Sequence, residues 1–362
     1  MFRFCVALLL SFSFLHTACA DVKIGTWNLE HLSVRPNKDF QSIARVARQV
    51  DFLAVQELMS EEALQALASE LTRQTGKHWS AMASHAVGRS SYKEMYGFLW
   101  RDDAVAYEDG AVSYLDRTDT FEREPYSAQF RSLKDGKTFV VATVHVLYGK
   151  NQADRASEIV ALSNYWTWLQ ETYPGNNRIM LMGDFNTPPN SPAWSKLDND
   201  ARPLVLNGAS TLSTTDGKFA NLYDNIFISK QSAIRVNKVE VYDYPKFLGL
   251  THAKGRDSVS DHAPIFLSAS LSGGSAAESA SAVTAQARPG TGTGTGSTMK
   301  PAASTSNPST HLALAIRGNK KTMVYHRPDC PSYNAIAEKN RVEFNSAAVA
   351  EAQHYRLAGN CR

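Results

Sequence analysis

The sequence predicts a layered α/β protein, in which helices pack against β-sheets. Short apolar runs alternate with segments of helical periodicity along residues 21–270. One run, TFVVATVHV at residues 138–146, is apolar almost throughout, which is typical of a strand covered on both faces. Strands and helices that alternate along a chain favour separate layers of the two kinds of element. We find no internal repeat.

Seven strands are expected, because seven short apolar runs are bounded by turn-forming residues. They cover residues 22–27, 52–56, 96–100, 138–146, 178–183, 224–229 and 263–268. Helical periodicity predicts helices over residues 38–50, 61–71 and 153–172. Ser60 is a typical N-terminal cap for the second helix, and Ser191-Pro192 indicates the start of a fourth.

The composition fits a soluble chain with one large core and an appendage. Of 362 residues, 43% are apolar and 20% are charged, which excludes a disordered or collagen-like protein. The formal net charge of +3 is unevenly distributed. Residues 21–270 hold 27 basic and 30 acidic side chains, whereas residues 311–362 hold eight and four. An acidic body therefore carries a basic tail.

The first twenty residues are typical of a secretory signal. Arg3 precedes an apolar run over residues 5–15, and Ala18-Cys19-Ala20 matches a small-x-small cleavage pattern. The run is too short to span a bilayer, as is every later segment. A buried helix and lipidation at Cys19 are the alternatives, but His16 stands where a lipidation site usually has an aliphatic residue. We expect cleavage after Ala20 and a secreted or periplasmic protein.

A linker is expected over residues 271–310. Gly, Ser, Ala, Thr or Pro occupy 32 of these 40 positions, including GTGTGTGS at residues 290–297, and none is aromatic. Such a segment cannot bury enough apolar surface to offset its chain entropy, so we expect it to be disordered. The linker separates a body at residues 21–270 from a tail at residues 311–362, which is too small to be robust without a covalent or metal staple.

Polar residues follow or precede several of the predicted strands, where side chains from distant segments can converge at one rim of a sheet. Acids, amides and imidazoles predominate among them: Asn28, Glu30, Glu57, His145, Asp184, Asn186, Asp261 and His262. Carboxylate and amide oxygens can hold a hard divalent cation, and imidazoles can bind a phosphate or move protons. This composition suits metal-assisted hydrolysis of phosphodiesters.

These residues lie in blocks that resemble the endonuclease/exonuclease/phosphatase superfamily. The blocks are WNLEHL at 27–32, VQE at 55–57, TVHV at 143–146, GDFN at 183–186 and SDHAP at 260–264. Two more, SYKEMY at 91–96 and Arg123-Glu124-Pro125, resemble the deoxyribonuclease I-like members. The resemblance implies two packed sheets flanked by helices, with the small tail as a separate α+β module.

The resemblance also implies roles for individual residues. Glu57 would be the principal ligand of Mg²⁺ or Mn²⁺, with Asn28 and Asp261 beside it and Glu30 as a further candidate. His145 and His262 would flank the scissile phosphate, backed by Glu94 and Asp224 respectively. Asp184 would lie near the attacking water and Asn186 against a phosphate oxygen. The DNA backbone would be contacted by Tyr92 and Arg123.

Several structural alternatives remain open for single residues. Asp224 could be a turn residue, Glu94 a solvated strand-edge charge, and Arg123 part of an exposed turn. The other four histidines that stand in the body, for which a structural role is expected, are His31, His78, His85 and His252. The sequence does not assign which catalytic imidazole is the acid and which the base. The body has no cysteine after removal of residues 1–20, unlike the mammalian enzyme of this family.

The leading hypothesis is a secreted, metal-dependent endonuclease that cleaves DNA, with RNA as an alternative, and that has little sequence specificity. A phospholipid or sphingolipid phosphodiesterase of the same superfamily is a rival. A non-catalytic protein that binds DNA or the cell envelope is a second rival. We expect a monomer without a transmembrane segment.

The tail resembles the small metal-binding module of the Ada DNA-repair protein, which uses four cysteines. His326 and Cys330 match the first two ligands and Cys361 the last, but Ala358 stands at the third. Zinc is therefore not expected there. A Cys330–Cys361 disulfide is favoured in an oxidising compartment and would stabilise the tail by roughly 3 to 4 kcal/mol. The basic charge suggests tethering to nucleic acid or to an anionic envelope surface, or a solvated domain with no partner.

Overall fold

A computed structural model describes residues 21–273 and, nearer the C-terminus, residues 316–327, 336, 340–344, 350, 355–358 and 361. The chain divides into two compact units, Met1–Thr284 and Ala285–Arg362. The expected signal at residues 1–20, residues 274–310 of the expected linker and Cys330 lie outside the described residues.

Two six-stranded mixed sheets form the first unit. The first has the order β11-β12-β1-β2-β4-β3, and the second has the order β5-β6-β7-β8-β10-β9. The first sheet consists of β1 (Val22–Leu32), β2 (Phe52–Leu58), β3 (Trp79–Ala83), β4 (Met95–Arg101), β11 (Arg235–Val241) and β12 (Ile265–Ser270). The second consists of β5 (Val105–Ser113), β6 (Tyr126–Ser132), β7 (Thr138–His145), β8 (Ile179–Asp184), β9 (Ala201–Pro203) and β10 (Asp224–Ser229).

Each sheet contains one parallel pair. β1 runs parallel to β2, with Asn28 opposite Gln56, and β7 runs parallel to β8, with His145 opposite Asp184. The other pairs of these two sheets are antiparallel, including β10 with β8, where Asp224 is opposite Asp184. The carboxyl ends of a parallel pair and the amino end of an antiparallel neighbour therefore share one edge of each sheet.

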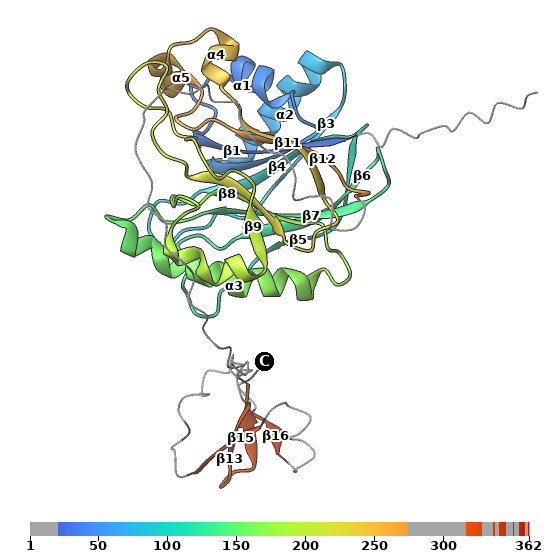
Figure 1. Ribbon diagram of the computed structural model, residues 1–362, viewed down its shortest axis with the longest axis vertical. Helices are drawn as coiled ribbons and strands as arrows, with labels where there is room; N and C mark the ends of the chain where they lie inside the picture. Colours follow the sequence, from blue (N-terminus) through green and yellow to red (C-terminus); the bar gives the residue numbers. More distant parts are fainter. Residues whose placement is uncertain are drawn as a thin grey trace, which may run out of the picture. The chain divides into compact units, whose positions relative to one another are not determined.

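Helices cover the outer faces of both sheets. In Figure 1, α1 (Phe40–Ala47) and α2 (Glu61–Thr75) lie over the first sheet, and α3 (Gln152–Thr172) lies over the second. Their caps are side-chain oxygens that accept from main-chain N–H groups, supplied by Asp39, Ser60 and Asn151. The short helices are α4 (Tyr244–Leu248), α5 (His252–Ser258), η1 (Pro192–Ser195) and η2 (Leu197–Asn199).

The predicted layered α/β fold is confirmed, and all seven predicted strands are present. Three helix predictions need adjustment. The helix expected over residues 61–71 continues to Thr75. The first helix, expected over residues 38–50, begins after its cap Asp39 and ends at Ala47. The segment that starts after Ser191 is a single 3-10 turn and not an α-helix.

Aromatic rings from both sheets make the centre of the sandwich. Phe52 of the first sheet lies 4.7 Å from Phe130 and 6.0 Å from Phe139 of the second, between ring centroids. Phe98, also of the first sheet, lies 5.5 Å from both Phe52 and Phe130. Aromatic packing of this kind joins the sheets through buried area and edge-to-face contacts.

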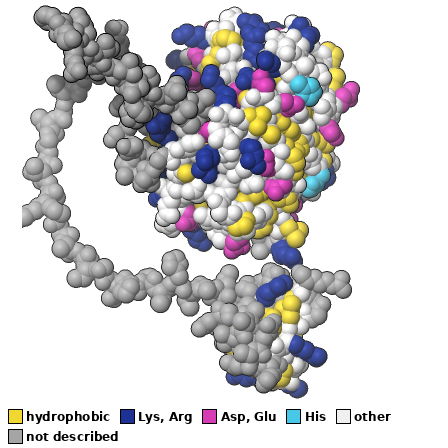
Figure 2. All heavy atoms as spheres, turned by 90° about the vertical axis from the view of Figure 1, so that its right-hand side faces the viewer, with side chains coloured by type: hydrophobic (Ala, Val, Ile, Leu, Met, Phe, Trp, Pro, Cys, Tyr) yellow, Lys and Arg dark blue, Asp and Glu magenta, His cyan; other side chains and the backbone are white. Residues whose placement is uncertain are grey.

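Charges of both signs are interspersed on one face of the first unit. On the face drawn in Figure 2, Lys and Arg side chains lie among Asp and Glu side chains. A polyanion would therefore have to be held on that face by local groups and not by a broad basic area.

The second unit contains a four-stranded sheet of order β15-β13-β14-β16. Its strands are β13 (Ile316–Asn319), β14 (Val324–His326), β15 (Arg341–Phe344) and β16 (Arg356–Leu357). Cys361 is disulfide-bonded, and its Sγ lies 3.8 Å from Nδ1 of His326. Because Cys330 is outside the described residues, the expected pairing stays a prediction, as does the likeness to the Ada module. Ala358 is buried beside Cys361.

Among the described helices, none combines the length and the apolar character needed to cross a lipid bilayer.

Replacement of Phe52 tests how much the aromatic packing between the two sheets contributes to stability. Phe52→Ala should lower the free energy of unfolding by about 3–5 kcal/mol, because it removes a fully buried ring and leaves a cavity that both sheets line. Urea denaturation followed by tryptophan fluorescence measures this. Leu115→Ala is the control, since Leu115 is 68% exposed and its loss should change the value by about 0.5 kcal/mol or less. Equal effects of the two substitutions would contradict the packing described.

Candidate active site

Side chains from strands of both sheets meet at one edge of the sandwich. The carboxyl-terminal parts of the two parallel pairs bring Asn28, Glu57, His145 and Asp184 to this edge. The antiparallel neighbours β4, β10 and β12 run in the opposite direction, so they contribute residues at or just before their first positions. These residues are Glu94, Asp224, Asp261 and His262.

Asp184 lies at the centre of the cluster and contacts both histidines and Asn28. It is 1% exposed, and its Oδ2 lies 3.6 Å from Nε2 of both His145 and His262. Asn28 donates from Nδ2 to the same oxygen at 3.1 Å, and the main-chain N–H of Asn186 donates to Oδ1 at 2.8 Å. Because an unpaired buried carboxylate is costly, these partners both stabilise Asp184 and are oriented by it.

His145 is held from behind by Glu94. Its Nδ1 lies 2.7 Å from Glu94 Oε1, and Nε of Arg123 lies 3.4 Å from the same oxygen. Burial alone lowers the pKa of His145, but the Glu94 and Asp184 carboxylates together outweigh it, so the net shift is upward. Burial alone raises the pKa of Glu94, but His145 and Arg123 outweigh it, so the net shift is downward. The pair is therefore favoured as imidazolium and carboxylate.

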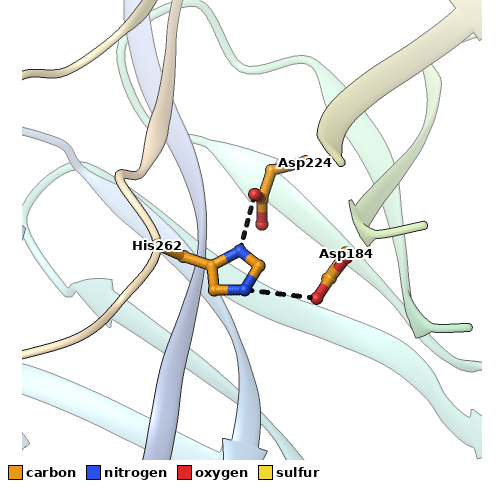
Figure 3. A group of neighbouring side chains, drawn as sticks. All are labelled: Asp184, Asp224 and His262. Atoms are coloured by element: carbon orange, nitrogen blue, oxygen red, sulfur yellow. Dashed lines mark hydrogen bonds and ion pairs between the residues drawn. The ribbon is translucent and has the colours of Figure 1, made fainter. Parts of the chain in front are cut away.

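His262 has the same arrangement with different partners. Figure 3 shows its ring between Asp224, 2.7 Å from Nδ1, and Asp184, 3.6 Å from Nε2. Ser210 donates its hydroxyl to Asp224 Oδ2 at 2.6 Å and thereby fixes that carboxylate. Burial alone lowers the pKa of His262, but Asp224 and Asp184 outweigh it and raise this pKa well above its usual value. Both rings thus favour the charged form and point Nε2 at one carboxylate.

The strand registers are interrupted around Glu57, the acid near the end of β2. The pairing of β1 with β2 shifts between Asn28 and Leu32, and the pairing of β2 with β4 shifts between Val55 and Leu58. Glu57 lies within these irregular stretches with φ at 56°, a left-handed conformation that costs energy for a non-glycine residue. Irregularities of this kind re-aim side chains beside functional sites.

Oxygen-rich side chains next to Asp184 fit a hard divalent cation. Asn28 donates from Nδ2 to Glu57 Oε1 at 2.9 Å. Burial, then the negative charge of Asp261, raises the pKa of Glu30. Lys38 Nζ lies 3.8 Å from Glu30 Oε2. Carboxylate and amide oxygens are the donors that Mg²⁺ and Mn²⁺ prefer, so the chemistry of this group suits such an ion.

A second group of potential ligands overlaps the histidine pairs. Ligand atoms of Asp184, Asp224 and His262 all lie within 4.8 Å of one another. However, both nitrogens of the His262 ring face carboxylates, and the raised pKa of His262 favours the protonated ring. A metal ligand must be deprotonated. We therefore prefer the group around Glu57 as the cation site.

Asn186 stands at the rim of the cluster in a constrained conformation. Its φ is 47°, and its side-chain Nδ2 donates to the main-chain oxygen of Val146 at 2.9 Å. Asparagine tolerates the left-handed region better than most residues, which explains its fit here. The amide has a second N–H, which could meet an oxygen of a bound anion.

The two residues expected to contact DNA are placed differently from each other. Tyr92 is 40% exposed, and its hydroxyl donates to Glu94 Oε2 at 3.3 Å. Arg123 is 8% exposed and donates from Nε to the main-chain oxygen of His145 at 3.0 Å. Arg123 thus lies behind His145, so its DNA contact stays a prediction, while its contacts with Glu94 and His145 are those of a positioning residue.

Sequence reasoning missed several residues that shape the site. Ser260 donates its hydroxyl to the main-chain oxygen of Asn28 at 2.6 Å and accepts from the N–H of His262 at 3.0 Å. His31, expected to be structural, donates its main-chain N–H to Glu57 Oε2 at 3.1 Å. Isolated serines in loops carry no pattern that would single them out, whereas the position of His31 within WNLEHL was a usable signal.

The two-sheet sandwich and its rim of acids, amides and carboxylate-backed imidazoles define a phosphoesterase-like protein. Residues 25–262 match the Endonuclease/Exonuclease/phosphatase family, and the chain belongs to that family. The resemblance deduced from the sequence blocks is thereby confirmed.

Three similar proteins illustrate what the chain resembles within and around this family. A protein named Deoxyribonuclease from Thioalkalivibrio sp. (strain K90mix) is 44% identical over 258 residues, which are 69% of this chain and 71% of the relative. Deoxyribonuclease-1 of Oryctolagus cuniculus is 27% identical over 279 residues, 71% of this chain and 95% of the relative. The solved catalytic domain of human Nocturnin with bound sulfate shares the fold at 13% identity and a TM-score of 0.50, covering 69% and 94% of the two chains.

The raised histidine pKa values predict a specific pH dependence of stability. A group whose folded pKa exceeds its unfolded value of about 6.5 stabilises fully below that pH and loses its contribution as the pH rises through the folded pKa. The free energy of unfolding should therefore fall as the pH rises above about 6.5 and through the raised pKa values of the two histidines. Asp224→Asn should flatten this fall by up to about 1.4 kcal/mol per pH unit, because a neutral amide no longer raises the pKa of His262.

Urea denaturation at several pH values measures the slope. Asp257→Asn is the matched control, since this carboxylate is on the surface and pairs with Lys254. It should keep the wild-type slope. The same slope in all three proteins would contradict the assignment of a charged His262.

Proposed function

We propose that this protein is a secreted, divalent-metal-dependent endonuclease that hydrolyses phosphodiester bonds of DNA with little sequence specificity. The observation that supports it most is the pair of imidazoles, His145 and His262, each bonded to a buried carboxylate and each facing Asp184. The acid and amide group around Glu57 adjoins them. The relatives named as deoxyribonucleases direct the proposal to DNA.

In this proposal, Glu57, Asn28 and Asp261 hold Mg²⁺, or Mn²⁺ in its place, with Glu30 as a further candidate ligand. The bound ion supplies positive charge to the phosphoryl oxygens as negative charge develops on them. Asp184 orients the attacking water, since it is a fixed buried carboxylate at the centre of the cluster. Asn186 donates a hydrogen bond to a phosphoryl oxygen.

One histidine acts as the acid in its imidazolium form, and the other must first lose its own proton to act as the base that accepts the proton of the attacking water. Because Nδ1 of each ring is bonded to a carboxylate, Nε2 is the nitrogen that each presents to the phosphate. Glu94 and Asp224 keep the rings in this orientation and favour the imidazolium, which can protonate the departing sugar oxygen. The similar surroundings of the two rings leave both assignments of the acid open.

Recognition in this proposal rests on the DNA backbone. The exposed hydroxyphenyl of Tyr92 lies beside the cluster and packs edge-on against His31, with ring centroids 5.7 Å apart. Contacts to phosphate and sugar fix the position of a duplex without reading its sequence, so weak specificity follows. The basic tail would add non-specific attraction to DNA or to an anionic envelope surface. Secretion rests on residues 1–20, and a monomer is the expected state.

Plasmid nicking in the presence of Mg²⁺ tests the proposal. The wild-type protein should convert supercoiled plasmid to the open circle, and His262→Ala should slow this roughly 10²- to 10⁴-fold, because it removes a proton-transfer group. His78→Ala is the control. His78 is an exposed histidine that also contacts a carboxylate, that of Asp102, but it is not part of the candidate active site.

The rival functions give other outcomes in the same experiment. Hydrolysis of sphingomyelin or phospholipid vesicles without nicking would replace the proposal with a lipid phosphodiesterase. Gel retardation of the plasmid without cleavage would indicate a binding protein. An RNA substrate cleaved faster than DNA would change the substrate class but not the chemistry.

Substitution of the principal ligand tests the cation site. Glu57→Gln should raise the Mg²⁺ concentration needed for half-maximal nicking at least about tenfold, since it removes a negative charge but keeps an oxygen that can accept from Asn28. EDTA should abolish nicking by the wild type. Glu62→Gln, on the exposed face of α2, is the control and should leave the requirement unchanged. An unaltered requirement in Glu57→Gln would exclude Glu57 as the main ligand.

A further inference from the structure

An open cavity of about 550 Å³ adjoins the catalytic cluster on the side of the second sheet. The beginning of α3 contributes Gln152 and Arg155 to its lining, and the rest comes from residues 188–190 after Asn186, residues 206–208 after β9, and residues 220–223 before Asp224. Tyr223, which lines it, directly precedes Asp224. Nothing in the mechanism above uses this cavity.

Arg155 is a buried cation without an acidic partner. It is 9% exposed, and among the residues that the structure describes no carboxylate pairs with its guanidinium, while its buried Nε has no hydrogen bond. Nη1 donates to the main-chain oxygen of Asn186 and lies 3.4 Å from the hydroxyl of Tyr223. The other strongly buried arginine of the site, Arg123, does have an acid beside it, Glu94. An unpaired buried charge is costly, which is typical of a group that receives its partner from a ligand.

Two tyrosine rings orient this guanidinium. Its central carbon lies 5.0 Å from the ring centroid of Tyr148 and 5.6 Å from that of Tyr223. Cation–π contacts hold the planar group in place without neutralising its charge. Nη1 is engaged by Asn186 and Tyr223, so Nε, which has no partner among the described residues, and Nη2 are the donors left for an anion.

The remaining lining mixes amide side chains with apolar residues such as Pro188, Leu206 and Leu222, and it carries no acid. It includes the side chains of Gln152, Asn190, Asn207 and Asn221, which are neutral hydrogen-bonding groups. A cavity with one fixed positive charge, several amides and no carboxylate suits an anionic ligand rich in oxygen. The hydrogen bond from Arg155 to Asn186 places that charge next to the residue proposed to contact the scissile phosphate.

We propose that this cavity binds the internucleotide phosphate adjacent to the scissile one on the same DNA strand, with Arg155 as its charge partner. The proposal rests on the function proposed above and adds a substrate subsite to it. Occupation of the subsite would align the strand, so that a diester with a neighbouring phosphate is cleaved better than an isolated diester.

Oligonucleotides with one methylphosphonate test this directly. Each substrate carries a single uncharged linkage at one position on either side of a defined cleavable bond, and cleavage of that bond is followed. For the wild type, one flanking replacement should lower kcat/KM about 10- to 100-fold, the value of a hydrogen bond to a charged group. Arg155→Met should lower kcat/KM by a similar factor on the all-phosphate substrate. The same methylphosphonate replacement should then cause no further decrease in this variant.

Further variants separate the subsite from the chemistry. Bis(p-nitrophenyl) phosphate is a diester without a neighbouring phosphate, so Arg155→Met should lose much less on it than on the oligonucleotide. Arg155→Lys keeps the charge but not the fork, and its loss should be intermediate. Arg73→Met is the control, because Arg73 is an exposed arginine on α2 whose partner is Glu70. It should cleave both substrates at the wild-type rate.

The failures of the two proposals are distinguishable. If the wild type cleaves the oligonucleotide at the same rate whichever flanking linkage is neutral, the subsite is overturned while the nuclease function stands. The same holds if Arg155→Met and the methylphosphonate lower the rate independently. If the wild type cleaves no DNA at all, both proposals fall. Because the linkage scan uses the wild-type protein, it decides the question even if Arg155→Met does not fold.

Discussion

The site depends on one buried carboxylate that two imidazoles share. Asp184 lies 3.6 Å from Nε2 of His145 and of His262, and these residues come from β8, β7 and the segment before β12. The contact exists because each sheet has a parallel pair whose carboxyl ends reach the same edge of the sandwich. Glu94 and Asp224 then hold the far sides of the rings. The position of Asp184 therefore couples the packing of two sheets to the protonation of the groups proposed for catalysis.

Much of the fold was predictable because a buried strand must consist mostly of apolar residues, and such runs are visible in the sequence. Strands β1, β2, β4, β7, β8, β10 and β12 are the apolar runs that the core needs, and all were predicted. The strands of the first unit that were missed, β3, β5, β6, β9 and β11, are short or carry many polar residues. β5 and β11, for example, lie at sheet edges and read VAYEDGAVS and RVNKVEV. One face of such a strand is solvated, so its hydrophobic pattern is weak.

The site was predictable only in part, for a different reason. Glu94 and His145 are 51 residues apart, and no local pattern connects them, so their pairing followed from the family resemblance alone. The left-handed backbone of Glu57 and the hydrogen bond from Ser210 to Asp224 arise from tertiary packing. The burial of Arg123 and of Arg155 has the same origin, since a sequence does not show whether an arginine faces solvent or a neighbouring carbonyl. The tertiary partners of a buried guanidinium decide its role. Arg123 has Glu94 beside it and positions His145, whereas Arg155 has no acidic partner in the part of the chain that the structure describes and can bind an anionic ligand.

The central claim is that the strand ends form one cation-binding cluster centred on Glu57, with the two histidines beside it and not within it. A crystal structure of the protein soaked in Mn²⁺ tests this most directly, through the anomalous scattering of the ion. The account predicts a peak against Glu57 and its neighbours Asn28 and Asp261. A peak between Asp184, Asp224 and His262, or a cluster with no ion at saturating Mn²⁺, would contradict it.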